Sequence, residues 1–259
     1  MTVHLLNDMA CLPSDRASGK PRTGKWWMLI AFFLMLVSFS LYGQVVVNEI
    51  MASNATAHAD PDQGTFTDWV EIYNAGSTQA DLSGWFLSDD PDDTGQWAFP
   101  QGTRLGPYAY LLVYADGTGQ GLHTSFKLSK EGETILLANA AQTVVDSVSY
   151  PPQLTDISYG RSRTAPSLFG FFEDPTPGYI NGPDLIAGIA DPPQFSLESG
   201  FYPGALFITL TSSTAGAEIR YTLDGTKPTA ASPLYTGPLQ LNATSVVRAR
   251  SFASGLLTA

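Results

Sequence analysis

Short segments rich in Val, Ile, Leu, Tyr and Trp alternate with clusters of Gly, Asn, Asp and Pro along most of the chain. This pattern is typical of β-strands joined by tight turns. No window keeps a 3.6-residue apolar period between helix caps, so the sequence predicts no helix. The strands predicted in the first half are Val45–Ile50, Trp69–Asn74, Trp85–Leu87, Tyr110–Ala115, Thr134–Ala138 and Thr143–Tyr150. Their even spacing favours a sandwich or a barrel.

Proline and glycine punctuate residues 175–193, which predicts a domain boundary. We place a first domain at 44–182, a linker at 183–191 and a second domain at 192–259. In the second domain, strands are predicted at 205–211, 218–223 and 246–252, with a short element at 234–235. Alternation puts leucines and isoleucines on one face of these strands and charged side chains on the other.

The first 43 residues have the layout of a secretory signal peptide. An uncharged run, Trp26–Tyr42, is followed by Gly43, after which cleavage is predicted. The run is short for a transmembrane helix, although an uncleaved anchor is the alternative. In both cases the remaining chain is exported, and we expect a secreted or cell-surface bacterial protein. Basic residues precede the run: Arg16, Lys20, Arg22 and Lys25.

The chain without this leader is strongly acidic. The whole sequence has 13 Lys+Arg and 24 Asp+Glu, and the leader contains 4 and 2 of them, which leaves 9 − 22 = −13. Such a surface repels nucleic acid and anionic lipid, so we expect neither nucleic acid nor a membrane as a partner beyond the leader. The single cysteine, Cys11, lies in the leader, so the exported part has no disulfide and no thiol chemistry. An exported chain without disulfides favours a bacterial exoprotein.

A run of motifs spans the first domain in order: VVVNEIMASN, DWVEIYNAGS, DLSGWFLSDD, WAFPQGTRLGPYAYLLVYAD, HTSFKLSKEGETILL, VVDSVSY, DISYGR and PTPGYIN. Together they resemble a lamin-tail domain of the bacterial, secreted kind, over residues 45–182. The resemblance implies an immunoglobulin-like β-sandwich without catalytic activity.

Residues 192–259 resemble the chitobiase/β-hexosaminidase C-terminal module, on AEIRYTLDGTKPTAASPLYTGPLQL and VVRARSF. This resemblance also implies a non-catalytic immunoglobulin-like sandwich, so the predicted fold is all-β, with two such domains in tandem. The family pattern continues into one more strand, so we expect the module to lack its last strand and the strand at 246–252 to have an open edge.

The pair of modules indicates exported adhesion or spacer modules at the N-terminal end of a larger protein. One alternative is the accessory region of a secreted enzyme, a spore-coat H-type kinase or a hydrolase, whose catalytic domain lies beyond residue 259. Another is a carbohydrate-binding module, with an extracellular polysaccharide or cell-envelope polymer as its partner. Trp85, Trp97, Tyr108 and Tyr110 could stack on sugars, although a sandwich core is the more common place for such side chains.

No catalytic residue is predicted. His123 lies near Asp116 and Ser125 in sequence, but the serine is not in a nucleophile elbow, and a triad is defined by geometry. GTGQG at 117–121 lacks the lysine and the helix of a phosphate-binding loop. No cofactor is predicted apart from weak calcium at two acidic loops, formed by Asp60 and Asp62 and by Asp89, Asp90, Asp92 and Asp93. Solvated acidic turns are the alternative interpretation.

Two further sets of charged residues stand out against apolar strands. Glu49 and Glu71 interrupt such strands, so we expect a buried carboxylate that pairs with Arg161 or Arg163 or accepts backbone N–H bonds. The alternative is that both carboxylates point into solvent. Arg220, Arg248 and Arg250 alternate with apolar residues on strands expected to be neighbours, which predicts a patch for anions. Isolated solvated arginines are the alternative there.

Overall fold

The computed structural model describes residues 44–258. Every regular element in this range is a strand, which confirms the all-β prediction. The predicted leader lies outside the described residues. Across 44–258, no helix is long and apolar enough to cross a membrane.

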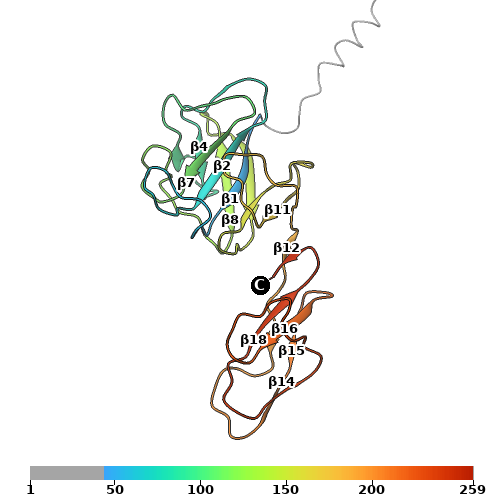
Figure 1. The fold of residues 1–259 in the computed structure, drawn as a ribbon. Helices are drawn as coiled ribbons and strands as arrows, with labels where there is room; N and C mark the ends of the chain where they lie inside the picture. The colour runs from blue at the N-terminus through green and yellow to red at the C-terminus, as the bar shows by residue number, and fades with distance from the viewer. Residues whose placement is uncertain (1–43, 259) are drawn as a thin grey trace, which may run out of the picture. The chain divides into compact units, whose positions relative to one another are not determined.

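The first module is a sandwich of two antiparallel sheets (Figure 1). One sheet has the order β11-β10-β1-β2-β7, and the other has the order β5-β4-β8-β9. The strands of the first sheet are β1 (Val45–Met51), β2 (Trp69–Asn74), β7 (Tyr110–Tyr114), β10 (Ser158–Arg161) and β11 (Phe169–Phe172). Those of the second are β4 (Phe86–Ser88), β5 (Trp97–Ala98), β8 (Glu133–Ala138) and β9 (Val144–Tyr150). A short ladder of β3 (Ala80–Asp81) and β6 (Arg104–Leu105) completes the module.

The two sheets enclose one hydrophobic core. Val47, Ile72 and Val113 contribute to it from the first sheet, and Leu87 and Ile135 from the second, all fully buried. The six predicted strands of this module are present, each within one residue of its predicted ends. The sequence pattern missed the short strands and the pair β10 and β11, because SYGR and FGFF lack both length and alternation.

A bulge in β1 decides which side chains face this core. The register with β2 pairs Val47 with Ile72 and then Glu49 with Glu71, so Asn48 is the extra residue. A side chain changes face at every residue of a strand, and one inserted residue therefore exchanges the two faces beyond it. Val47 and Ile50 consequently both reach the core, while Glu49 faces the outer side of the sheet.

The second module is built from two-stranded ladders around a smaller core. Ile208, Leu210 and Ile219 are its buried residues, and partly buried aromatic and aliphatic side chains pack on them. The ladders are β13-β15, β14-β17, β16-β18 and the parallel pair β12-β19. The strands are β12 (Gly188–Ile189), β13 (Gln194–Phe195), β14 (Leu206–Ile208), β15 (Leu210–Thr211), β16 (Glu218–Thr222), β17 (Leu239–Leu241), β18 (Arg248–Phe252) and β19 (Leu256–Leu257).

Three of the predicted strands of this module correspond to observed ones, at β14–β15, β16 and β18. Leu234 forms only an isolated bridge with Arg220. Within residues 44–258, β18 pairs in a ladder with β16 alone. The chain after β18 forms the short strand β19, which pairs with β12 rather than with β18.

Candidate functional site

Two carboxylates lie side by side on the outer face of the first sheet. Glu49 and Glu71 are cross-strand partners, and both are fully buried. Ionised carboxylates are rarely buried without hydrogen-bond donors, because losing water costs several kcal/mol per charge. Their surroundings therefore decide whether this pair is a reactive site or a structural one.

The segment PTPGYIN covers the pair and supplies the backbone N–H donors, while side chains of the sheet supply further ones. The backbone N–H of Thr176 donates to Glu49 over 3.2 Å, and that of Gly178 donates to Glu71 Oε2 over 2.5 Å. The Ser158 hydroxyl also donates to Glu49. The amide of the bulged Asn48 donates to Glu71 Oε1 over 2.8 Å. Both carboxylates thus accept backbone N–H bonds, one of the two kinds of partner expected for them, and neither points into solvent.

Burial, together with the charge of the neighbouring Glu49, raises the pKa of Glu71 to about 8, against the lowering effect of its hydrogen bonds to Gly178 and Asn48. Burial also raises the pKa of Glu49, against the lowering effect of its hydrogen bonds to Ser158 and Thr176. Raised carboxyl pKa values are typical of general acids, but an acid must be able to reach a substrate. Since both side chains have no exposed surface, the pair acts as a polar centre of the fold.

Arg161 has a different partner from the expected glutamates. Its guanidinium donates to Asp146 Oδ2 over 2.5 Å and to the carbonyl of Val47 over 2.6 Å, and it lies over the ring of Phe169. Arg163 is exposed. The first sheet and β9 are therefore joined by an ion pair that the residue pattern did not assign.

The acidic loop at 60–62 lies close to His123, which forms an isolated bridge with Tyr114 at the end of β7. Asp60, Asp62 and His123 each offer a ligand atom, and these atoms lie within 4.8 Å of one another. His123 Nδ1 is also 2.9 Å from Asp116 Oδ2. The aspartates at 89–93 are not members of this group. They instead stabilise their own turn, in which Asp90 Oδ1 accepts the N–H of Asp92.

His123 and Asp116 form two thirds of a possible triad, but Ser125 does not complete it. The Ser125 hydroxyl donates to the carbonyl of Gln96 over 3.0 Å. Asp116 Oδ1 accepts both the N–H and the hydroxyl of Thr118, at 2.8 Å each, so the aspartate is held by its own loop. His123 therefore does not activate Ser125 as a nucleophile, and the side chains of the stretch HTSFKLS make structural contacts here.

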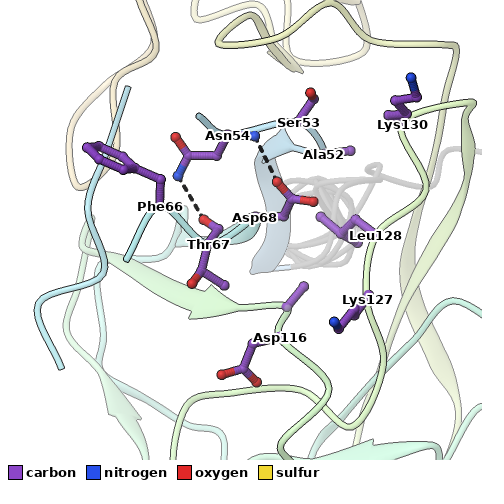
Figure 2. Close-up of a pocket in the computed structure, with 11 residues that line it drawn as sticks. Ala52, Ser53, Asn54, Phe66, Thr67, Asp68, Asp116, Lys127, Leu128 and Lys130 are labelled. Atoms are coloured by element: carbon purple, nitrogen blue, oxygen red, sulfur yellow. Dashed lines mark hydrogen bonds between the residues drawn. The ribbon is translucent and has the colours of Figure 1, made fainter. Parts of the chain in front are cut away.

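An open hollow of about 520 Å³ is lined in part by Asp116, the hydrogen-bond partner of His123. Figure 2 shows Asn54, Thr67 and Asp68 on one side of it and Lys127 and Lys130 on the other. Asp68 Oδ1 accepts the N–H of Asn54 over 2.8 Å, and the Asn54 amide donates to the Thr67 carbonyl over 2.8 Å. Burial raises the pKa of Asp68. Nothing in the residue pattern had singled out this hollow, because its walls are far apart in the sequence.

Phe66 is 46% exposed and lines the same hollow. Among the aromatics named from the sequence, Trp97 is buried in the core and Trp85 packs against that core. Tyr110 stacks on Tyr73 at 4.6 Å, and Tyr108 is exposed. In the first module, Phe66 is thus an exposed aromatic on a polar, concave surface, and the pattern of strand aromatics did not indicate it.

The three arginines of the second module share one face of one sheet. Arg220 and Arg250 are direct cross-strand partners, and Arg248 lies opposite Thr222. Each of them is engaged by neighbours within the module: Arg220 donates to Glu218 over 2.6 Å, Arg250 to the Thr258 carbonyl over 2.6 Å and Arg248 to the Gly225 carbonyl over 3.3 Å. At least one donor of each arginine is thus used within the module.

Comparison with known families agrees with the geometry of both modules. Residues 40–152 match the model of the Lamin Tail Domain, and residues 197–258 match that of the Chitobiase/beta-hexosaminidase C-terminal domain. No curated protein matches the chain. Both matched families are non-catalytic immunoglobulin-like modules, which agrees with the all-β, mainly antiparallel sheets of the structure.

Proposed function

We propose that the chain is an exported, non-catalytic segment that attaches to an extracellular polymer. The proposal is based on the match to the Lamin Tail Domain, followed by the match to the Chitobiase/beta-hexosaminidase C-terminal domain. The matched families are compatible with a simple spacer role. The observation that supports attachment as well is the hollow with Phe66 at its edge. An acidic, disulfide-free chain behind a leader of secretory layout supports export.

The hollow has the features of a shallow sugar-binding surface. The ring of Phe66 lies at the edge of the hollow and is directed away from Asp68 and Lys127 (Figure 2). It offers an apolar face for one sugar ring of a polymer, while Asp68 and Lys127 offer charged hydrogen-bonding groups for the hydroxyls of a neighbouring ring. The walls are held by hydrogen bonds of Asn54 to the backbone of both 58 and 67, so the surface is present before a ligand binds. An open, polar hollow suits a polymer chain better than a small enclosed ligand.

Polysaccharide pull-down tests this function. We expect the protein to be retained by at least one of chitin, peptidoglycan and plant polysaccharide. We expect Phe66→Ala to lower that retention about tenfold, since full burial of a phenylalanine side chain is worth roughly 1.5–3 kcal/mol and a ligand would bury part of this one. Phe201→Ala is the matched control, because Phe201 is a fully exposed phenylalanine of the second module. Retention that is equal in the two variants, or no retention on any polymer, would rule out attachment through this hollow.

Export has its own test. Protein recovered from the medium or the periplasm is expected to begin near Gln44, where the small residues of the leader meet the first strand. Intact-mass measurement reads this directly. Recovery only in the membrane fraction, with Met1 or Met9 retained, would show that the leader is an anchor.

A further inference from the structure

One buried carboxylate oxygen of the first module accepts no hydrogen bond. Asp60 is fully buried, and its Oδ2 is without a hydrogen-bond partner within the described residues. The other oxygen, Oδ1, accepts the N–H of Asp62 over 2.8 Å. A buried carboxylate oxygen without a donor is costly, and such groups in native proteins call for an explanation such as a bound ion.

Asp60 Oδ2 points into the cluster formed with Asp62 and His123. It lies 3.9 Å from His123 Nδ1, while Asp62 Oδ2 lies 3.7 Å from His123 Nε2. Ligand atoms around a tetrahedral Zn²⁺ are separated by about 3.4 Å, given bonds of roughly 2.0–2.2 Å. The two measured distances end on different ring nitrogens. One ligand atom of each residue lies within 4.8 Å of the other two, so a shared ion would draw them together by up to about 1.4 Å.

The imidazole of His123 is oriented for this role by a second carboxylate. Asp116 Oδ2 lies 2.9 Å from Nδ1, which favours the proton on Nδ1 and leaves the lone pair of Nε2 for a metal. Gln63 donates to the same Asp116 oxygen over 2.7 Å and so fixes the aspartate. Carboxylate–histidine–metal arrangements of this kind hold the ligand in one tautomer and raise its basicity.

The backbone around the cluster is equally well held. The Asp60 N–H donates to the Thr65 carbonyl over 2.7 Å, and the Gly64 N–H donates to the Asp60 carbonyl over 2.8 Å, which closes a compact turn. Across from it, the residues on either side of His123 bond to Tyr114 of β7, since Tyr114 N–H donates to the Leu122 carbonyl and Thr124 N–H to the Tyr114 carbonyl. An ion here would tie the 60–65 turn to the end of β7.

We propose that Asp60, Asp62 and His123 bind a divalent first-row transition-metal ion, with Zn²⁺ as the reference ion and Asp116 as the residue that positions His123. The ligand set argues against calcium, which takes six to eight oxygen ligands, whereas an imidazole nitrogen is a common ligand of zinc and its neighbours. Asp62 has a 77% exposed side chain, so the site opens to solvent and a three-residue set leaves a coordination position on that side.

Isothermal titration calorimetry on the purified protein, without a polyhistidine tag, tests the site with Zn²⁺, Ca²⁺ and Mg²⁺ in turn. We expect one equivalent of Zn²⁺ to bind at least tenfold more tightly than either alkaline-earth ion. Asp62→Asn and His123→Gln are each expected to weaken Zn²⁺ binding by tenfold or more, and Asp116→Asn by about 10–100-fold. Asp92→Asn, an exposed acidic residue of the other loop, is the control and should bind like the wild type.

Melting curves show whether a variant has lost the site or the fold. Asp62 is exposed, so Asp62→Asn should melt like the wild type without metal, yet lose the rise in Tm of about 5–10 °C expected at free Zn²⁺ a hundredfold above its Kd. Calcium binding tighter than zinc, or zinc binding equal in wild type and Asp62→Asn, would overturn the proposal. Since no polymer is present in these measurements, their outcome is independent of the proposed attachment function.

Discussion

The free energy of unfolding is expected to fall by up to about 5 kcal/mol as the pH rises from 4.5 to 8, because of Glu71 alone. The ordinary pKa of a glutamate is 4.5, and that of Glu71 in the folded protein is about 8. The product (8 − 4.5) × 1.36 kcal/mol gives this upper figure. Between these pH values the unfolded chain releases the proton while the folded one keeps it, so rising pH favours unfolding. Below pH 4.5 the stabilisation is complete, and above pH 8 no further loss follows from this group.

Glu49 acts in the same direction, since burial also raises its pKa. Asp68 also acts in this direction, because burial raises its pKa. Two other carboxyl groups act oppositely but outside this range of pH. The pKa values of Asp116 and Asp156 are lowered, chiefly by hydrogen bonds to neighbouring threonines, which offset their desolvation. The stabilisation that these two residues provide is lost only as the pH falls below the ordinary aspartate range. The slope between pH 5 and pH 8 therefore reports on the buried pair together with Asp68.

Urea unfolding at pH 5, 6, 7 and 8, with a chelator present to exclude metal effects, measures this slope. Glu71→Gln should flatten most of it, whatever its effect on absolute stability, because glutamine does not titrate. Glu131→Gln is the control, since its side chain is 75% exposed. A wild-type slope that survives unchanged in Glu71→Gln would refute the assignment of the pH dependence to the buried pair.

The second large effect is expected from the ion pair between Arg161 and Asp146. Asp146→Ala should destabilise the protein by about 3–5 kcal/mol, because it leaves a buried guanidinium without its counter-charge. The same oxygen, Asp146 Oδ2, also accepts the N–H of Val47 over 2.8 Å, so a donor of β1 loses its partner as well. The side chains of Arg161 and Asp146 are only 8% and 16% exposed.

The chain contains a matched control for this prediction. Glu218 accepts a hydrogen bond from Arg220 over 2.6 Å, nearly the same length, but its side chain is 57% exposed. Glu218→Ala is expected to cost less than about 1 kcal/mol, as exposed pairs usually do. Urea unfolding of both variants at pH 7 gives the comparison. Similar costs for the two would mean that burial does not determine the strength of the Arg161–Asp146 pair.

Much of the first module could be predicted from local pattern. Strands such as 69–74 and 110–114 are long enough to show β-branched and aromatic residues between turn residues, and they appear where they were expected. β10 and β11 could not be found in this way. β11 pairs with β10 along its length, and β10 in turn pairs with β1, so the conformation of both strands depends on a partner that is distant in sequence.

The candidate sites divide in the same manner. The residue pattern pointed to Asp60, Asp62, Glu49 and Glu71 because charges stood out in loops or interrupted apolar strands. It did not pair Asp60 with His123, nor identify Thr176 and Gly178 as the donors that cover the glutamates. These two donors lie in PTPGYIN, a proline- and glycine-rich run for which the sequence indicated only turns near the domain boundary.

The sequence by itself determined the all-β class, the two successive modules and most of their longer strands, since these follow from periodicity and turn residues within a few positions. Only the tertiary structure decided that the bulge at Asn48 turns Glu49 out of the core and that His123 joins the 60–62 loop. A strand's pattern records its alternation but not the register or the neighbours that meet it. Those depend on contacts between distant segments, which the packing of the whole module selects.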